Sequence, residues 1–141
     1  MSLTEFAKDR DRILRAAAQV TGKTYPSPGS ALPDLFRLAG YRIGRKRMPA
    51  NTFGFLDVDS RTAFICDDLE GRIPYGVPSV QVRILAEMMG DLRLHLEQIH
   101  NGEWFDQDQS ALWASVFLGE PTEELSRLEE GYPREKFVFC N

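Results

Sequence analysis

The sequence predicts an α+β fold, in which a small, mainly antiparallel sheet of three strands packs on a central helix with flanking helices. Apolar residues recur at helical spacing between residues 79 and 102, and three short apolar segments joined by short links lie between residues 41 and 66. A hydrophobic content of 43% suffices for one core. A chain of 141 residues is too short for two ordinary domains. We therefore expect a single domain over residues 1–141.

The N-terminal part is expected to form two helices. Thr4 can cap the first, which covers residues 4–20 and ends before Gly22. A turn-rich linker follows at residues 25–30, where two prolines flank serine and a glycine. Residues 32–39 then form a short helix that ends at Gly40.

The strands and the remaining helices follow in order along the chain. Strands are expected at residues 41–43, 52–56 and 62–66, followed by a long loop over residues 67–78. Ser79 can cap the central helix, which ends near Gly102. Three further elements complete the chain: a helix over residues 106–118, a helix from Pro121 to about residue 129, and a late strand over residues 136–140.

Composition and charge exclude several classes of protein. No apolar stretch approaches the roughly 18 residues that cross a bilayer, so we expect a cytoplasmic protein without membrane contact. Seventeen Lys and Arg against 21 Asp and Glu leave a net charge of -4, which disfavours a general nucleic-acid coat. Cys66 and Cys140 form no zinc or disulfide pattern, and no phosphate-binding or dinucleotide-binding glycine motif is present. A Cys66–His95 pair stays open as a nucleophile and base.

The central helix carries the most specific motif, because residues 83–95 read RILAEMMGDLRLH. This resembles the central helix of the ImmA/IrrE family of zinc-dependent peptidases, which has the form R-F-T-L-A-H-E-L-G-H-L-L-L-H. In that family the two His of HExxH bind zinc, and the Glu between them activates water. Here Glu87 stands at the first His, Met88 at the Glu and Asp91 at the second His. The resemblance therefore implies a catalytically degenerate member.

Flanking segments extend the resemblance to residues 31–121 and leave residues 122–141 as a C-terminal extension. Residues 33–43 resemble the family's short helix and first strand, and residues 109–118 resemble the segment E-A-x-x-F-A-x-x-L-L, with Gln109 at the Glu that is its third zinc ligand. The family implies a zincin-like fold. Its members often sit beside helix-turn-helix repressors in phages or other mobile elements, so the implied partner is a protein such as a transcriptional repressor.

Considered without the family, Arg83, Glu87, Asp91 and His95 follow one another at four-residue steps on one edge of the helix. A ladder of salt bridges is one interpretation of this spacing. A divalent metal site is the other interpretation. Two carboxylates before the next helix would add ligands to it, and such an oxygen-rich ligand set favours Mg, Mn or Ca. Those two carboxylates are Asp106 and Asp108, which equally suit the positive end of a helix dipole.

Four cations at residues 42–47 form the strongest candidate surface for a partner: Arg42, Arg45, Lys46 and Arg47. They favour an acidic protein surface, since no aromatic residues are interleaved with them as in proteins that bind single-stranded nucleic acid. We expect a regulatory, protein-binding domain that lacks catalysis and needs no cofactor. One alternative is a metal-dependent hydrolase rebuilt from Glu87, Asp91 and His95; a second is a domain that contacts nucleic acid through residues 42–47.

Overall fold

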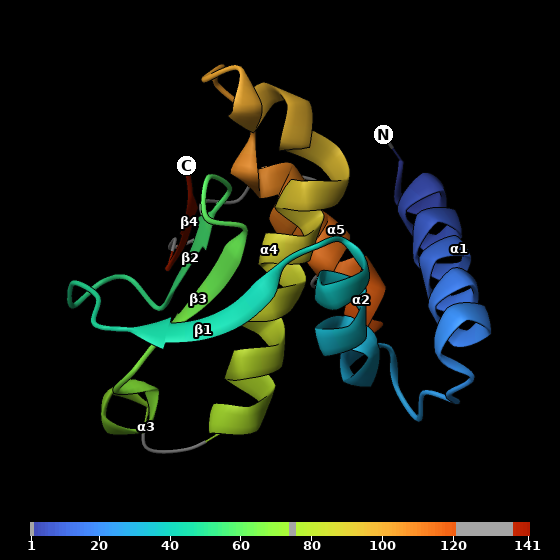
Figure 1. Ribbon diagram of the computed structural model, residues 1–141, viewed down its shortest axis with the longest axis horizontal. Helices are drawn as coiled ribbons and strands as arrows, with labels where there is room; N and C mark the ends of the chain where they lie inside the picture. The colour runs from blue at the N-terminus through green and yellow to red at the C-terminus, as the bar shows by residue number, and fades with distance from the viewer. Residues whose placement is uncertain (1, 74–75, 121–136) are drawn as a thin grey trace.

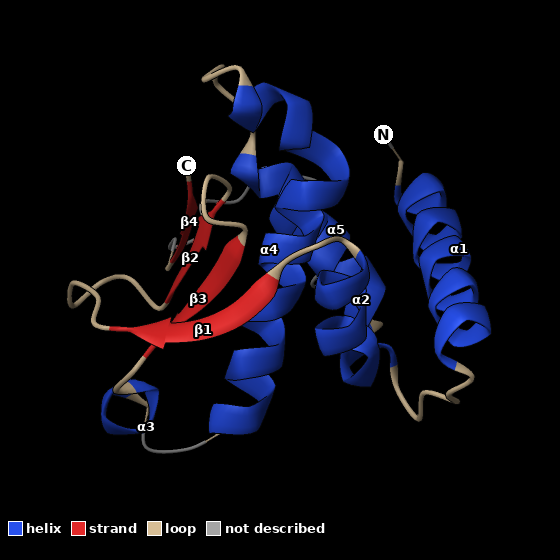
Figure 2. Cartoon of the chain, in the orientation of Figure 1, coloured by secondary structure: helices blue, strands red, loops and turns tan. Residues whose placement is uncertain are grey.

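A four-stranded mixed sheet and a long central helix organise the protein, with helices α1 and α2 on the side of the central helix that faces away from the sheet and the short helix α3 on the sheet side (Figure 1). The computed structural model describes residues 2–73, 76–120 and 137–141. Figure 2 shows the strands together on one side of the molecule and the helices α1 and α2 on the other. The α+β class expected from the sequence is confirmed.

Helix α1 spans Leu3–Thr21, slightly longer than expected at both ends. Its N-cap is Ser2 rather than Thr4, because the Ser2 hydroxyl accepts a hydrogen bond of 3.2 Å from the amide of Glu5. Gly22 ends the helix with φ 69°. A short 3₁₀ turn, η1 (Pro28–Ala31), begins within the stretch that was expected to be a linker. It leads directly into α2 (Leu32–Leu38), which agrees with the expected second helix.

The sheet has the order β1-β3-β2-β4, with β1 (Arg42–Lys46) and β4 (Val138–Cys140) at its edges. Strands β2 (Gly54–Asp57) and β3 (Thr62–Cys66) form an antiparallel hairpin, whereas β1 pairs with β3 in parallel and β4 pairs with β2 in parallel. The expectation of three mainly antiparallel strands is therefore wrong. The tight hairpin occupies one edge of β3, so β1 takes the other, and β4 comes from a part of the chain distant in sequence.

Helix α3 (Leu69–Arg72) lies inside the segment expected to be a loop. Central helix α4 spans Val77–His100 and begins after Gly76 with Pro78 in its first turn, two residues before the expected cap at Ser79. Helix α5 (Gln107–Leu118) agrees with its prediction. The late strand is present as β4, while the helix expected after Pro121 lies outside the described residues.

The core lies between the sheet and α4 and continues between α4 and α5. Leu56, Ala63 and Ile65 on the inner face of the sheet are fully buried, as are Trp113 and Phe117 on α5. Helix α4 contacts β2, β3 and β4 on one side and α5 and α2 on the others. This arrangement makes α4 the element from which any site near the sheet must be built.

Candidate functional site

The first position of the altered motif, Glu87, forms a salt bridge with Arg83 one turn earlier on α4. The Arg83 Nε to Glu87 Oε1 distance is 3.2 Å, and both side chains are largely buried. Arg83 also pairs with Glu120 and donates a hydrogen bond of 3.1 Å to the carbonyl of Ala111. The first step of the predicted ladder is confirmed, and its cation additionally joins α4 to α5.

The second position, Met88, is fully buried in the hydrophobic core. A thioether cannot accept a proton from water, and a fully buried side chain has no access to bulk solvent. The donor set therefore does not fit a zinc peptidase: Glu87 is held by an arginine, and the position of the general base belongs to the core. No hydrolytic step can be derived through this site.

The third position, Asp91, is a buried carboxylate with 2% of its surface exposed. Burial of the Cys140 thiol on β4 raises its pKa, and the nearby carboxylates of Asp91 and Asp57 raise it further. His95, one turn later, uses its Nδ1 in a hydrogen bond of 2.7 Å with Gln98 and packs its ring against Phe105. His95 is thus engaged along its own helix and with the loop that follows.

The two aspartates before α5 have different roles. Asp106 is the N-cap of α5, since its carboxylate accepts a hydrogen bond of 2.9 Å from the amide of Asp108. Asp108 is exposed in the first turn, and Gln109 is half-buried. Within residues 2–73, 76–120 and 137–141, no three His, Cys, Asp or Glu side chains come close enough together to hold a metal ion.

Helices α4 and α5 approach most closely at Gly90, a contact that the sequence did not single out. A Cβ added to Gly90 would lie 2.7 Å from the carbonyl oxygen of Ser110. Ser110 is 1% exposed and directly follows Gln109 in the first turns of α5. A glycine in the middle of a strongly apolar helix was the available signal, because such a residue often marks close backbone approach.

Cys66 gives no support to a catalytic cysteine. The thiol is fully buried at the end of β3, and burial raises its pKa, opposed by the nearby cation of Arg72. A thiol whose pKa is raised holds less thiolate at neutral pH and is a weaker nucleophile. The structure therefore does not favour the pair with His95 that the sequence left open.

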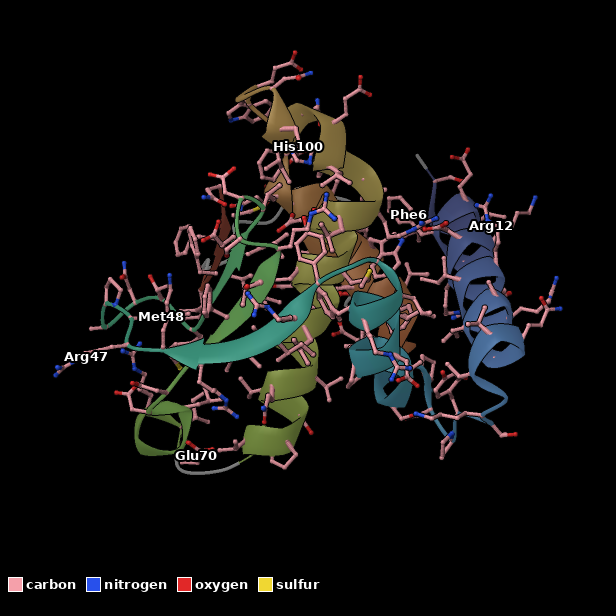
Figure 3. The ribbon with its side chains drawn as sticks, in the orientation of Figure 1. Phe6, Arg12, Arg47, Met48, Glu70 and His100 are labelled. Carbon is pink, nitrogen blue, oxygen red and sulfur yellow. The ribbon has the colours of Figure 1, made fainter. Side chains whose placement is uncertain are left out.

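The basic segment, residues 42–47, forms the exposed edge strand β1 and the start of the next loop. Arg45 donates a hydrogen bond of 3.2 Å to the carbonyl of Cys66. The ammonium of Lys46 lies 4.6 Å and 4.4 Å from the ring centres of Phe55 and Phe64. Arg42 and Arg47 are exposed, and Arg47 projects from the end of the strand (Figure 3).

An aromatic row crosses the outer face of the sheet beside this basic segment, although the sequence showed no such association. Phe55 on β2 is in register with Phe64 on β3 and with Phe139 on β4, so the three half-buried side chains lie on the same face. Gly44 is in register with Phe64 and adds no side chain beside its ring. Only strand pairing brings these rings together.

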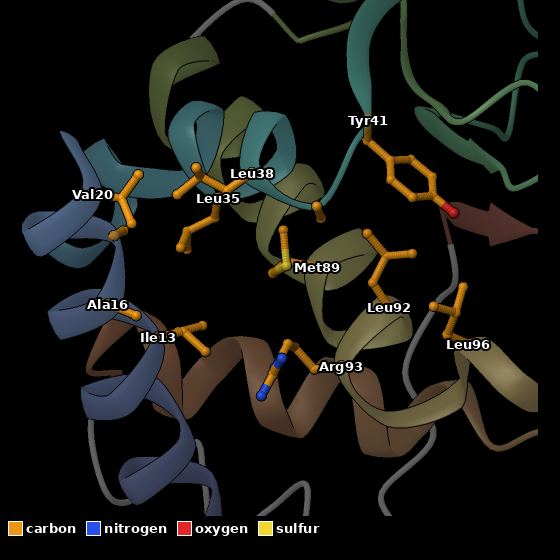
Figure 4. A pocket seen from close by; sticks show the side chains of 12 residues that line it. Ile13, Ala16, Val20, Leu35, Leu38, Tyr41, Met89, Leu92, Arg93 and Leu96 are labelled. Carbon is orange, nitrogen blue, oxygen red and sulfur yellow. The ribbon is translucent and has the colours of Figure 1, made fainter.

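An apolar groove runs between α1, α2 and α4 on the side of α4 away from the sheet (Figure 4). We call it the three-helix groove; its cavity volume is about 480 Å³. Its lining is apolar except for the side chain of Arg93 and the hydroxyl of Tyr41: Ile13, Ala16, Ala17, Val20, Leu35, Leu38, Ala39, Tyr41, Met89, Leu92, Arg93 and Leu96. Several of these were expected to belong to the apolar faces of helices, but their lining of a groove was not.

Fold and site together define an α+β protein with a four-stranded mixed sheet, a central helix that carries Glu87, Met88 and Asp91 at the compared positions, and a groove formed by helices. Comparison with protein-family models, with curated proteins and with solved structures finds no match to this chain. Among the described residues, no helix is long and apolar enough to span a membrane.

Proposed function

We propose that this protein is a catalytically degenerate, zincin-like domain that acts by recognising another protein. The observation that carries the proposal is the burial of Met88 in the core at the position where the resembled peptidases hold their general base. The salt bridge from Arg83 to Glu87 supports it, because the carboxylate at the first ligand position is already neutralised by a cation of the same helix.

The resemblance to the ImmA/IrrE family names the partner that we propose, a transcriptional repressor of the helix-turn-helix class encoded by a mobile element. We also propose that the protein acts in the cytoplasm. Its two cysteines, Cys66 and Cys140, are both free thiols, which agrees with a reducing compartment. Calorimetric titration of the purified chain with such a repressor measures recognition directly, and the repressor should remain uncleaved.

Zinc binding by a restored motif tests the proposed ancestry. The variant Glu87→His, Asp91→His, Gln109→Glu returns the three ligands of the family while leaving Met88 in the core. We expect metal analysis to find no stoichiometric zinc in the natural chain and about one zinc per restored chain, since three such ligands form a catalytic-type zinc site.

A matched control removes the same charges without supplying imidazoles: Glu87→Gln with Asp91→Asn. It should take up no zinc, and thermal melting establishes that both variants are folded. Tightly held zinc in the natural chain, or a folded restored variant that binds none, would contradict the proposal.

Single-stranded nucleic acid is a second candidate ligand, favoured by the row of Phe55, Phe64 and Phe139 beside Lys46. Bases stack on such rings, and neighbouring cations pair with phosphates. Binding of a labelled oligonucleotide should weaken with salt and should fall several-fold in Phe64→Leu, which keeps apolar volume but loses the ring. No binding at low salt would remove this candidate. The metal-dependent hydrolase stays a prediction that no contact in the described residues favours.

A further inference from the structure

The three-helix groove exposes apolar surface that a monomer would normally cover. Val20 is 70% exposed and Leu38 is 46% exposed, and these two side chains stand on opposite walls, on α1 and α2. The floor is formed by Met89 and Leu92 of α4. Contiguous apolar surface of this kind, bordered by charged residues, is typical of sites that bind another chain.

The shape of the groove suits a helix. Its walls are themselves helices, and the apolar side chains along α4 recur at a spacing of three and four residues at Met89, Leu92 and Leu96. A guest helix with apolar residues at i, i+3, i+4 and i+7 can pack its side chains between such rows.

Charged clusters on the elements that form the groove carry an excess of cations. Arg93, which lines the groove, shares the carboxylate of Asp9 with Arg12, so two cations face one anion. At α2, Lys23 and Arg37 likewise share the carboxylate of Asp34. Each carboxylate is therefore outnumbered by cations, and each cluster has an excess positive charge.

This local excess belongs to a wider division of charge along the chain. Residues 1–41, which supply two walls of the groove, hold six of the 17 Lys and Arg and four of the 21 Asp and Glu, although the whole chain has a net charge of -4. An anionic ligand is therefore attracted to this part of the molecule in preference to the rest.

We propose that the three-helix groove binds an amphipathic helix of a partner protein, one whose apolar stripe is flanked by acidic residues. This inference rests on the proposed function in protein recognition and names the surface and the chemistry of the partner. A second copy of the chain is the poorer guest, because a symmetric dimer through this groove would bring two cationic rims together.

The test uses the full-length protein and a panel of fluorescein-labelled peptides of about 18 residues, which form about five helical turns. Each carries leucines at the spacing above; one set has glutamates beside the stripe, and a matched set has lysines there. Fluorescence anisotropy should show that the acidic set binds at least about tenfold more tightly than the basic set, and that added salt weakens this binding.

Two substitutions locate the binding surface. Val20→Glu and Leu38→Glu place a charge in the groove at positions already exposed, so folding should be retained, and each should weaken binding of the acidic peptides by about tenfold or more. Trp104→Glu is the matched control, since Trp104 is 83% exposed but lies outside the groove, and it should leave binding unchanged.

Three outcomes overturn the inference. They are equal binding of acidic and basic peptides, failure of every acidic peptide to bind, and a dimer by light scattering that dissociates in Val20→Glu. The last would make a second copy the occupant. Each is separable from failure of the proposed function, which is decided by zinc content and by the restored motif rather than by peptide binding.

Discussion

At the scale of single residues, Asp9 is a buried charge with three partners, which come from three helices. Its carboxylate, 5% exposed on α1, accepts hydrogen bonds from Arg93 Nε at 3.0 Å and from Trp113 Nε1 at 3.1 Å, and it pairs with Arg12 at 3.2 Å. Burial by itself would raise the pKa of Asp9, but hydrogen bonding and the charge of Arg93 outweigh burial and hold the pKa below its ordinary value.

We therefore expect Asp9→Asn to lower the free energy of unfolding at neutral pH by about 1–3 kcal/mol, because hydrogen bonds to a charged group are lost and Arg93 keeps no buried counterion. The pKa is lower in the folded state, so the carboxylate stabilises the fold above its ordinary pKa and this contribution disappears as the pH falls through the folded value. Urea unfolding of both proteins across the acidic range measures the difference, which should shrink at the lowest pH.

The control for this substitution is Asp11→Asn. Asp11 is exposed, and among the described residues its ion pair is with the neighbouring Arg10, so its replacement should change the unfolding free energy by less than about 0.5 kcal/mol. A loss as large as that of Asp9→Asn, or a loss for Asp9→Asn that does not depend on pH, would show that the Asp9 network does not stabilise the fold as described.

The residue scale also shows the limit of spacing arguments. Four-residue steps correctly paired Arg83 with Glu87, since both lie on one helix and the distance follows from helix geometry. The same reasoning could not identify the partners of Asp9 on α1, which include Arg93 on α4 and Trp113 on α5. Spacing cannot reveal contacts between elements.

At the scale of elements, the packing of α4 on α5 depends on a glycine. A Cβ at Gly90 would meet backbone atoms of Ser110, and a backbone carbonyl cannot rotate aside as a long side chain can. The Gly90→Ala substitution improves the intrinsic preference for helix by roughly 1 kcal/mol, yet the clash acts against this gain.

We expect Gly90→Ala to destabilise the protein by about 1–3 kcal/mol overall, because the two helices must separate to admit the methyl group. Gly71→Ala is the matched control: a Cβ there meets nothing within 4 Å, so it should be neutral or slightly stabilising. Equilibrium unfolding in urea compares the two. A Gly90→Ala protein at least as stable as Gly71→Ala would mean that the helices are less closely packed than described.

The elements were predictable to the extent that their signals are local. Helices α1, α2, α4 and α5 and strands β2 and β3 were expected close to their observed bounds, because apolar periodicity, caps and glycines act over a few residues. Helix α3 was missed, since four residues carry too little pattern to be distinguished from a loop. The start of α4 was misplaced because Ser79 resembles a cap although Pro78 already lies within the helix.

At the scale of the whole molecule, the order of the strands decides which residues share a surface. Parallel pairing places the basic strand β1 at one edge, and β4 joins β2 from the far end of the chain. The aromatic row beside Lys46 exists only through this order. The three-helix groove likewise exists only because α1, α2 and α4, which lie apart in the sequence, surround one apolar space.

By itself, the sequence determined the α+β class, most helices and the hairpin, since each depends on residue identity and short-range periodicity. Only the tertiary structure decided the strand order, the pairing of the late strand with β2, the buried state of Met88 and the groove between the helices. These depend on which distant segments pack together, and the free energy of that packing comes from surface buried between elements rather than within them.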